Sequence, residues 1–526
     1  MRLLTTLAVL FTASSVWAQP FTNASQSLAK YSVAELAPGK SCESLSSFKG
    51  EGIVSIAARV VPATADTPQH CRVVGTITPE VAFEVNLPDR WNGRFYMTGN
   101  GGLAGDALDT PNNADRTGAL ANGFAMARTN TGHDNRKEPS GSFILSNPQK
   151  AIDYAYRAVH VTAETAKKIA TDYYARPITF SYWNSCSNGG RQGLLEAQRF
   201  PDDFDGIVAN APWVDQTGFT IGAMWNQRAL TDAPVSLAKM ALVAERAMAK
   251  CDEVDGLKDG LIDDPRKCSF DPSRDVPVCR EGSDTADCLT PAQAGTVKKI
   301  YSGPTTSNGK ALFPGFMVGS EAVNTAPNGT TTSGWANAIV AAQPTAKPAD
   351  FNLAEGVMKY LILDPPRPEY DTMTFDYDKD TKLVERWSKL ADAKDPDLSK
   401  FRKSGGKLIM TYGWADTILQ PLMGVNYYEA VVAKNGKNAA DFARLFMVPG
   451  MAHCGGGIGP DRNDAVTAVI DWVEKGKAPD QLIASKVTNG KVVRTRPLCP
   501  YPQVARYKGQ GSIDEAANFS CVAPGK

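Results

Sequence analysis

Short apolar segments alternate with helical patterns along much of the chain. Apolar runs that end near glycine, proline or small polar residues are typical of buried parallel strands. Such runs occur at Arg94–Thr98, Gly123–Arg128, Ile178–Trp183, Gly206–Ala209, Lys407–Tyr412 and Ala443–Val448. Apolar residues recur at helical spacing in Ile152–Tyr173, Arg191–Phe200 and Ala465–Gly476. This alternation predicts an α/β fold built on a parallel sheet.

The alternation stops in the middle of the chain. Residues 214–393 are rich in Pro, Asp, Asn, Thr and Gly, and four cysteines fall between Cys251 and Cys288. The strand pattern then resumes at Lys407. A chain of 526 residues is long for one domain but suits one large domain with an insertion. We therefore expect a catalytic domain formed by residues 19–213 and 394–526, with residues 214–393 inserted as a lid. An independent second domain is the alternative.

The N-terminal segment has the features of a secretory signal. A positive Arg2 precedes a mostly apolar run, and Val16-Trp17-Ala18 resembles a small-x-small cleavage site. The apolar run is too short to span a bilayer. We expect residues 1–18 to be a cleaved signal peptide and the mature protein to be secreted or periplasmic.

Composition restricts the partners and the redox compartment. The formal net charge is +0, so nothing directs the protein toward nucleic acid or an anionic membrane. A small-molecule substrate is the expected partner. The ten cysteines are an even number in an exported chain and include no C-x-x-C pair. Disulfides are therefore expected, and a zinc ribbon or a thioredoxin-like site is not.

The segment "SYWNSCSNGGRQG" has the pattern of a nucleophile elbow, which needs a strand, a tight turn that holds a serine, and a helix. Here the strand ends in a turn that holds Ser187, and small residues at Gly189, Gly190 and Gly193 allow a helix to pack closely against the strand. Free amides at the start of that helix would stabilise a developing oxyanion. The first glycine of the usual G-x-S-x-G pattern is absent, and a serine in a turn is commonly structural.

A serine nucleophile needs a base and a carboxylate that orients it. In an α/β-hydrolase the order along the chain is serine, acid, histidine, with acid and base after later strands. Asp416 and His453 meet both requirements. The other histidines precede Ser187. His70 and His160 are interpreted as surface or packing residues, and His133 as a residue that ties a loop together or lines the mouth of the site.

Two cysteines adjoin this predicted triad. Cys186 precedes Ser187, and Cys454 follows His453. If serine and histidine are hydrogen-bonded, their neighbours are within disulfide reach. We expect a Cys186–Cys454 bridge that fixes the nucleophile beside the base.

At these residues the chain strongly resembles the tannase and feruloyl esterase family, whose signature joins Cys-Ser, Asp and His-Cys. The likeness covers most of the mature chain and includes "WNGRFYMTGNGG", "NTGHDN", "QRFPDDFDGIVANAP", "CDEVDGLKDGLIDDP", "VPGMAHCGGG" and "RTRPLCPYPQVARYKG". The resemblance implies an α/β-hydrolase core with a large lid that hydrolyses esters of aromatic acids, such as galloyl and feruloyl esters. The bacterial branch includes mono(2-hydroxyethyl) terephthalate hydrolases, which are the alternative.

The same resemblance implies further site residues. It places the oxyanion amides at Gly102 and Asn188. It implies a structural calcium site in the lid, with side-chain and carbonyl oxygens from Asp252, Asp255, Leu257, Asp259 and Leu261. Carboxylates and carbonyls suit calcium, although the spacing is not that of an EF-hand and a solvated acidic turn is the alternative. The remaining implied disulfides are Cys42–Cys71, Cys251–Cys268, Cys279–Cys288 and Cys499–Cys521.

The lid sequence bears on the substrate and leaves rivals open. Terephthalate half-ester hydrolases hold the substrate carboxylate with a lid arginine, and the matching stretch, residues 346–366, has none at the corresponding place. Lys347 is nearby, but lysine does not reproduce bidentate arginine geometry. Trp335, Leu353 and Tyr360 are candidates for apolar walls, or core residues. A secreted serine carboxypeptidase, or a calcium-dependent binding protein on an inactive hydrolase scaffold, would share several of these features.

Overall fold

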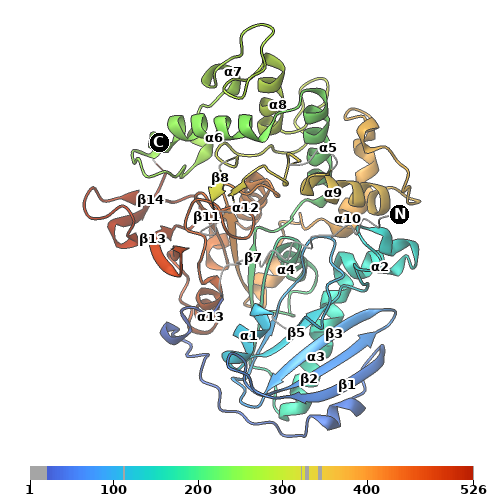
Figure 1. The fold of residues 1–526 in the computed structure, drawn as a ribbon. Helices are drawn as coiled ribbons and strands as arrows, with labels where there is room; N and C mark the ends of the chain where they lie inside the picture. Colours follow the sequence, from blue (N-terminus) through green and yellow to red (C-terminus); the bar gives the residue numbers. More distant parts are fainter. Residues whose placement is uncertain (1–19, 111–112, 322, 326–330, 342–345, 525–526) are drawn as a thin grey trace, which may run out of the picture.

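The structure is a computed structural model, and it describes residues 20–110, 113–321, 323–325, 331–341 and 346–524 (Figure 1). The predicted signal peptide lies outside the described residues. A mixed sheet crosses the middle of the molecule. Helices flank it on both faces, and a further group of helices lies beyond one end of its central strands (Figure 1).

The central sheet has nine strands. In spatial order they are β1 (Ile53–Val61), β2 (His70–Ile77), β3 (Val81–Pro88), β5 (Ala125–Thr129), β4 (Arg94–Met97), β6 (Phe180–Cys186), β7 (Gly206–Asn210), β10 (Lys407–Gly413) and β11 (Ala443–Val448). Neighbours from β5 to β11 are parallel, whereas β1, β2, β3 and β5 pair antiparallel. The six predicted strands form the parallel part, so the predicted α/β fold is confirmed.

Helices cover both faces of this sheet. They are α1 (Ala114–Ala121), α2 (Gln149–Ile152), α3 (Ala158–Tyr174), α4 (Asn188–Arg199), α12 (Pro421–Asn435) and α13 (Ala465–Lys475). Helices α3, α4 and α12 pack on one face, and α1 and α13 pack on the other. Consecutive residues of a strand point to opposite faces. In β6, Trp183 therefore joins the core under α4, whereas Tyr182 joins the core under α13.

The chain leaves the sheet after β7 and returns at β10. The elements between include α5 (Gln216–Asp232), α6 (Leu237–Cys251), α7 (Pro272–Asp275), α8 (Pro291–Ser302), β8 (Val323–Thr325), β9 (Thr331–Ser333), α9 (Ala349–Gly356), α10 (Glu385–Ala391) and α11 (Ser399–Lys403). Helices α5 to α10 gather at the top of Figure 1. The ends of the predicted insertion meet, because the Ala393 N–H donates to the Val214 carbonyl at 2.8 Å.

The inserted segment has a small core of its own and also shares the main core. Trp335, Val243 and Ile300 belong to its separate apolar cluster. Phe351 and Trp387 pack in the same core as α3 and α4. This shared packing joins part of the insertion firmly to the sheet domain.

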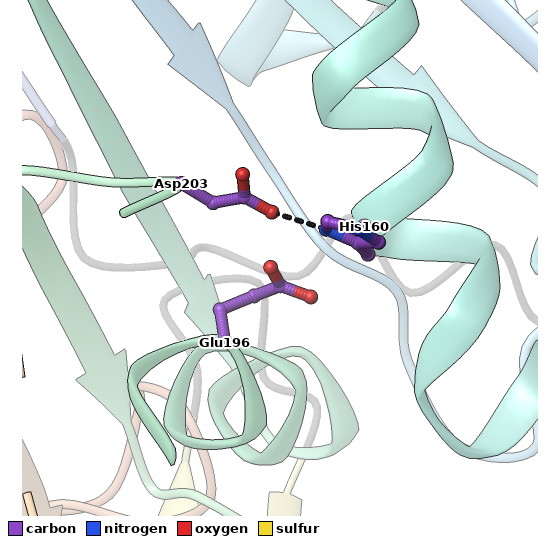
Figure 2. Close-up of side chains that lie close together, drawn as sticks. All are labelled: His160, Glu196 and Asp203. Carbon is purple, nitrogen blue, oxygen red and sulfur yellow. Dashed lines mark hydrogen bonds and ion pairs between the residues drawn. The ribbon is translucent and has the colours of Figure 1, made fainter. Parts of the chain in front are cut away.

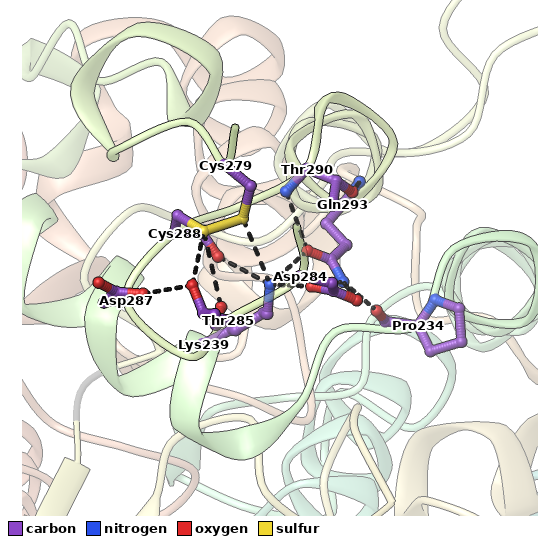
Figure 3. The surroundings of a disulfide bond; sticks show 9 residues. All are labelled: Pro234, Lys239, Cys279, Asp284, Thr285, Asp287, Cys288, Thr290 and Gln293. Atoms are coloured by element: carbon purple, nitrogen blue, oxygen red, sulfur yellow. Dashed lines mark hydrogen bonds and ion pairs between the residues drawn. A yellow bond between two sulfur atoms is a disulfide. The ribbon is translucent and has the colours of Figure 1, made fainter. Parts of the chain in front are cut away.

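A buried lysine organises one loop of the insertion (Figure 3). The Lys239 ammonium donates to the Cys288 carbonyl at 2.7 Å and to Gln293 Oε1 at 2.8 Å, and it pairs with Asp284. The disulfide Cys279–Cys288 closes the same loop. The Cys279–Cys288 disulfide and the contacts of the Lys239 ammonium therefore both hold this loop in place.

Two hairpins end the described chain. They are β12 (Leu482–Thr488) with β13 (Lys491–Leu498), and β14 (Val504–Tyr507) with β15 (Phe519–Val522). The five disulfides are Cys42–Cys71, Cys186–Cys454, Cys251–Cys268, Cys279–Cys288 and Cys499–Cys521, as predicted. In the part of the chain that the structure describes, no helix has both the length and the apolar character needed to cross a membrane.

Candidate active site

The loops that follow β4, β6, β10 and β11 carry the predicted site residues. Gly102, Ser187, Asp416 and His453 all lie just beyond the carboxyl ends of these parallel strands. The carboxyl ends of parallel strands share one edge of the sheet, and ligands of open α/β folds bind at that edge. The topology therefore places all four residues at the same edge.

Ser187 occupies a strained turn between β6 and α4. Its backbone has φ of 65° and ψ of −126°, a conformation uncommon for a residue with a side chain. Three backbone hydrogen bonds hold it: the Ser187 N–H donates to the Asn210 carbonyl at 2.9 Å, and the Ser187 carbonyl accepts the N–H groups of Arg191 and Trp213, each at 3.0 Å. The side chain does not cap the helix that follows. This is the geometry expected of a nucleophile elbow.

Glycines on α4 let the helix lie close to the strands. A Cβ on Gly190 would lie 2.8 Å from the Asn210 carbonyl oxygen, and a Cβ on Gly193 would lie 2.6 Å from the Trp183 ring. Both separations are shorter than side-chain contacts allow. The predicted close helix packing is therefore confirmed, and it brings the first turn of α4 up to the sheet edge.

His453 and Asp416 form a hydrogen-bonded pair. His453 Nδ1 lies 2.8 Å from Asp416 Oδ2, and the carboxylate is fully buried. Asp416 Oδ1 also accepts the N–H groups of Ile418 and Leu419, each at 2.9 Å. A carboxylate at Nδ1 favours the tautomer that carries its proton there, which leaves Nε2 able to accept one.

The Cys186–Cys454 disulfide joins the nucleophile turn to the histidine loop. The two Cα atoms are 5.9 Å apart. Because Ser187 and His453 are the chain neighbours of these cysteines, the bridge holds both residues at one place. The arrangement of a serine turn, a histidine and a buried carboxylate can carry out nucleophilic acyl transfer.

Gly102 and Asn188, the implied oxyanion residues, lie close together. The hydroxyl of Tyr154 is 3.2 Å from the Gly102 carbonyl oxygen and 3.3 Å from Asn188 Oδ1. Gly102 has φ of 49°, and a Cβ there would lie 3.7 Å from Leu353 of the insertion. Tyr154 was not identified from the sequence, because it lies in an ordinary helical pattern. Its contacts and the π-helical turn that carries it single it out.

The acidic loop of the insertion is tightly folded around its carboxylates. Asp252 Oδ1 accepts the N–H groups of Asp259 at 3.1 Å and Gly260 at 2.9 Å. Asp255 Oδ1 accepts the Leu257 N–H at 3.0 Å, and the Asp259 carboxylate accepts the Leu261 N–H at 3.1 Å. These are hard oxygen donors, with the Leu257 and Leu261 carbonyls in the same loop, and they fit the chemistry of a calcium site.

Asp263 and Arg496 adjoin this loop and were not predicted. Burial, followed by the charge of Asp255, raises the pKa of Asp263 to about 8. Arg496 is fully buried and pairs with Asp259, linking β13 to the loop. Asp263 recurs four residues after Asp259, a spacing that would have suggested it. No sequence signal identifies Arg496, which is far away in the chain.

One described group of three potential metal ligands has its ligand atoms within 4.8 Å of one another, and it lies outside the acidic loop. It consists of His160, Glu196 and Asp203 (Figure 2). His160 Nδ1 is 2.6 Å from Asp203 Oδ2, and the ring stacks on Phe200 at 3.7 Å. Lys167 donates to the Asp203 carbonyl at 2.6 Å and already supplies a cation here. The cluster fixes α3 to the turn after α4, and the packing interpretation of His160 is confirmed.

The remaining histidines are also structural. His70 is buried, with Nδ1 2.9 Å from the Pro68 carbonyl. His133 is buried against Phe143, with ring centroids 3.9 Å apart, and burial lowers its pKa to about 4. It stands beside Gly105, in the loop that follows Gly102, so it supports that loop.

The lid candidates have different surroundings. Trp335 is fully buried and donates to Ser320 Oγ at 2.9 Å, so it is a core residue. Leu353 approaches Gly102, and Tyr360 packs against Gly141. The Lys347 ammonium is exposed and pairs with Glu355, so its charge is already matched.

Comparison with known proteins identifies the family. The family profile described as "Tannase and feruloyl esterase" matches residues 65–522. Mono(2-hydroxyethyl) terephthalate hydrolase of Piscinibacter sakaiensis is 34% identical, over 93% of this chain and 92% of that protein. A probable feruloyl esterase of Arthroderma benhamiae is 33% identical, over 83% of this chain and 81% of that protein.

Solved structures show the same fold. Feruloyl esterase B from Aspergillus oryzae has a TM-score of 0.77 and 29% identity, and the match covers 91% of this chain and 99% of that one. Tannin acyl hydrolase from Aspergillus niger has a TM-score of 0.72 at 21% identity, over 96% of this chain and 97% of that one.

Proposed function

The chain belongs to the tannase and feruloyl esterase family, and we propose that it is an exported serine carboxylesterase that hydrolyses esters of aromatic acids, such as galloyl and feruloyl esters. The observation that carries this proposal is the hydrogen-bonded Asp416–His453 pair, joined through Cys186–Cys454 to the strained turn of Ser187. The five disulfides support export, because they are typical of oxidising compartments.

The reaction proceeds by two acyl transfers. His453 Nε2 accepts the proton of Ser187 Oγ while the oxygen attacks the ester carbonyl, and Asp416 stabilises the imidazolium. The oxyanion is stabilised by the N–H groups of Gly102 and Asn188. The tetrahedral intermediate expels the alcohol, which takes its proton from His453. A water molecule then attacks the acyl-enzyme and gives a proton to His453, which passes it to Ser187 Oγ as the aromatic acid is released.

A terephthalate half-ester is the second candidate substrate. The 34% identity to a mono(2-hydroxyethyl) terephthalate hydrolase over most of both chains favours it. The free carboxylate of such a substrate needs a cation in the lid. Lys347 is the nearby cation in the sequence, and Glu355 already pairs with it. This favours an uncharged aromatic acid moiety, such as a feruloyl or galloyl group.

A structural calcium ion belongs to the same proposal. The side chains of Asp252, Asp255 and Asp259 and the carbonyls of Leu257 and Leu261 would hold it. The ion would offset the charge that these carboxylates accumulate and would keep the loop folded. It takes no part in the reaction steps above.

Acid release from methyl gallate, methyl ferulate and mono(2-hydroxyethyl) terephthalate tests the function, with a peptide substrate alongside. We expect the wild type to cleave at least one aromatic ester and Ser187→Ala to cleave none. Cleavage of the peptide alone would instead identify a carboxypeptidase. Failure of a fluorophosphonate probe to label Ser187 in the calcium-loaded, oxidised protein would identify a binding protein on an inactive scaffold.

A further inference from the structure

One buried hydroxyl touches both sides of the proposed oxyanion hole. Tyr154 OH is 3.2 Å from the Gly102 carbonyl oxygen and 3.3 Å from Asn188 Oδ1. Gly102 belongs to the loop after β4, and Asn188 is the first residue of α4. These two segments are far apart in the sequence. Hydrogen bonds between Asn100 and Gln192 also join these segments, and Tyr154 adds a contact at Gly102 and Asn188 themselves.

The inserted segment holds this hydroxyl in place. Gln216 Nε2 donates to Tyr154 OH at 2.8 Å, so the hydroxyl keeps its own proton for Gly102 or Asn188. Gln216 Oε1 in turn accepts from Trp387 Nε1 at 2.6 Å. The Tyr154 and Trp387 rings are nearly parallel, with an interplanar angle of 7° and centroids 6.3 Å apart. All three side chains are buried.

The backbone of Tyr154 is also unusual. It lies in a π-helical turn, Asp153–Arg157, between α2 and α3. Such turns occur frequently at functional sites, because the extra residue redirects side chains that a regular helix would point elsewhere. The turn places the Tyr154 hydroxyl within hydrogen-bond distance of the Gly102 carbonyl.

A buried cation completes the arrangement. Arg191 Nε donates to Asn188 Oδ1 at 2.7 Å, and Nη1 donates to the Ala391 carbonyl at 2.7 Å. Its guanidinium lies 5.0 Å from the centroid of the Tyr154 ring. Among the described residues no carboxylate lies within salt-bridge distance of it. Its hydrogen bonds go to neutral oxygens, and the negative charge of Asp392 acts on it from a longer distance.

We propose that Tyr154 is a positioning residue that holds Gly102 and Asn188 at the separation needed for the oxyanion. Gln216 and Trp387 hold the Tyr154 side chain, so this separation depends on the insertion. The inference rests on the proposed function, since it assumes that these two residues supply the oxyanion amides. Oxyanion donors act only when they are placed where charge develops. A small shift of either segment would therefore reduce the rate without weakening substrate binding.

Tyr154→Phe tests this with the ring retained and the hydroxyl removed. We expect kcat for a p-nitrophenyl ester to fall about tenfold, with KM changed less than about twofold. Removing a direct oxyanion donor lowers kcat about 10²- to 10³-fold, and Tyr154 acts only through the residues that carry these donors. Labelling by a fluorophosphonate should slow by a similar factor. Tyr174→Phe is the matched control. It removes another buried hydroxyl, which donates to the Pro88 carbonyl at 2.8 Å away from the site.

The outcomes separate the inference from the function on which it rests. A wild type that neither cleaves the ester nor reacts with the probe would overturn both. A reactive wild type with kcat unchanged in Tyr154→Phe, or reduced equally in Tyr174→Phe, would overturn only the inference. If Tyr154→Phe does not fold, Gln216→Met serves instead. It removes the donor that holds the hydroxyl, and it should lower kcat about threefold at unchanged KM.

Discussion

Cys186 and Cys454 form a disulfide between the residue that precedes Ser187 and the residue that follows His453. The bond closes a sequence separation of 268 residues and connects the turn after β6 to the loop after β11. The Cys454 backbone has φ of 63° and the Ser187 backbone has φ of 65°. Ser187 therefore lies within a strained turn, and His453 is next to one. The bridge therefore fixes the site as well as the fold.

Removal of this bridge should reduce both stability and turnover. We expect Cys186→Ala with Cys454→Ala to lose about 4 kcal/mol of unfolding free energy, from the restored freedom of the unfolded chain. We also expect kcat to fall at least about tenfold at temperatures where the variant is folded, because Ser187 and His453 are no longer held together. Denaturant unfolding and ester hydrolysis measure the two effects.

The pair Cys42–Cys71 provides the control for that experiment. It closes a separation of 29 residues and lies at the antiparallel end of the sheet, away from the candidate site. Replacing both cysteines by alanine should lower stability and leave kcat within about twofold. Equal losses of kcat in the two double variants would contradict a catalytic role for the Cys186–Cys454 bridge.

Asp416→Asn should preserve the fold and remove most activity. The amide cannot stabilise an imidazolium, and it favours the wrong tautomer of His453, so kcat should fall about 10⁴-fold. Asp461→Asn is the matched control, because Asp461 accepts the Gly456 N–H at 2.8 Å in the histidine loop without contacting His453. A drop of kcat in the control as large as that in Asp416→Asn would show that the loop, and not the carboxylate at Nδ1, limits the reaction.

Calcium should stabilise the folded protein without entering the chemistry. With calcium at about 100 times its Kd, we expect about 2.7 kcal/mol of added stability, seen as a higher Tm than in a chelator. Asp255→Ala should abolish this calcium-dependent difference. Asp271→Ala, at an acidic position of the insertion that pairs with exposed Lys298, should retain it. A Tm independent of calcium in the wild type would eliminate the site.

The parallel half of the sheet could be predicted from the sequence, and the antiparallel half could not. Strands such as β6 and β10 are buried on both faces and read as continuous apolar runs. β3 mixes Glu84 and Asn86 with apolar residues, and Glu84 pairs with Arg72, Arg116 and Arg128. That pattern differs from the continuous apolar run of a buried strand. The ion pairs that stabilise β3 are long-range, and a single sequence does not reveal them.

The candidate site divides in the same way. Ser187, Asp416 and His453 could be located because each follows a recognisable strand, and their order along the chain is fixed by the fold. Tyr154 and Arg496 could not, because their roles depend on partners hundreds of residues away or on a local π-helical turn. Positioning residues generally leave no spacing pattern, whereas residues that share a strand end or a loop do.

Glu196 is the side chain with the clearest expected pH effect. It is buried on α4 with its carboxyl group beside Asp203, as Figure 2 shows. Burial, followed by the charge of Asp203, raises its pKa well above the ordinary value of a glutamate. Glu196 therefore stays protonated in the folded protein at pH values where it ionises in the unfolded chain. In that window the unfolded chain binds fewer protons, and stability falls as pH rises.

Glu196→Gln should remove this pH dependence. The variant and the wild type should be about equally stable near pH 4.5, and the variant should gain stability relative to the wild type as pH rises, by at most about 1.4 kcal/mol per pH unit. Denaturant midpoints at pH 5, 6.5 and 8 measure the difference. The stability of Glu164→Gln, at an exposed position of α3, should change with pH as that of the wild type does. A constant difference between Glu196→Gln and the wild type over this range would mean that Glu196 ionises normally in the fold.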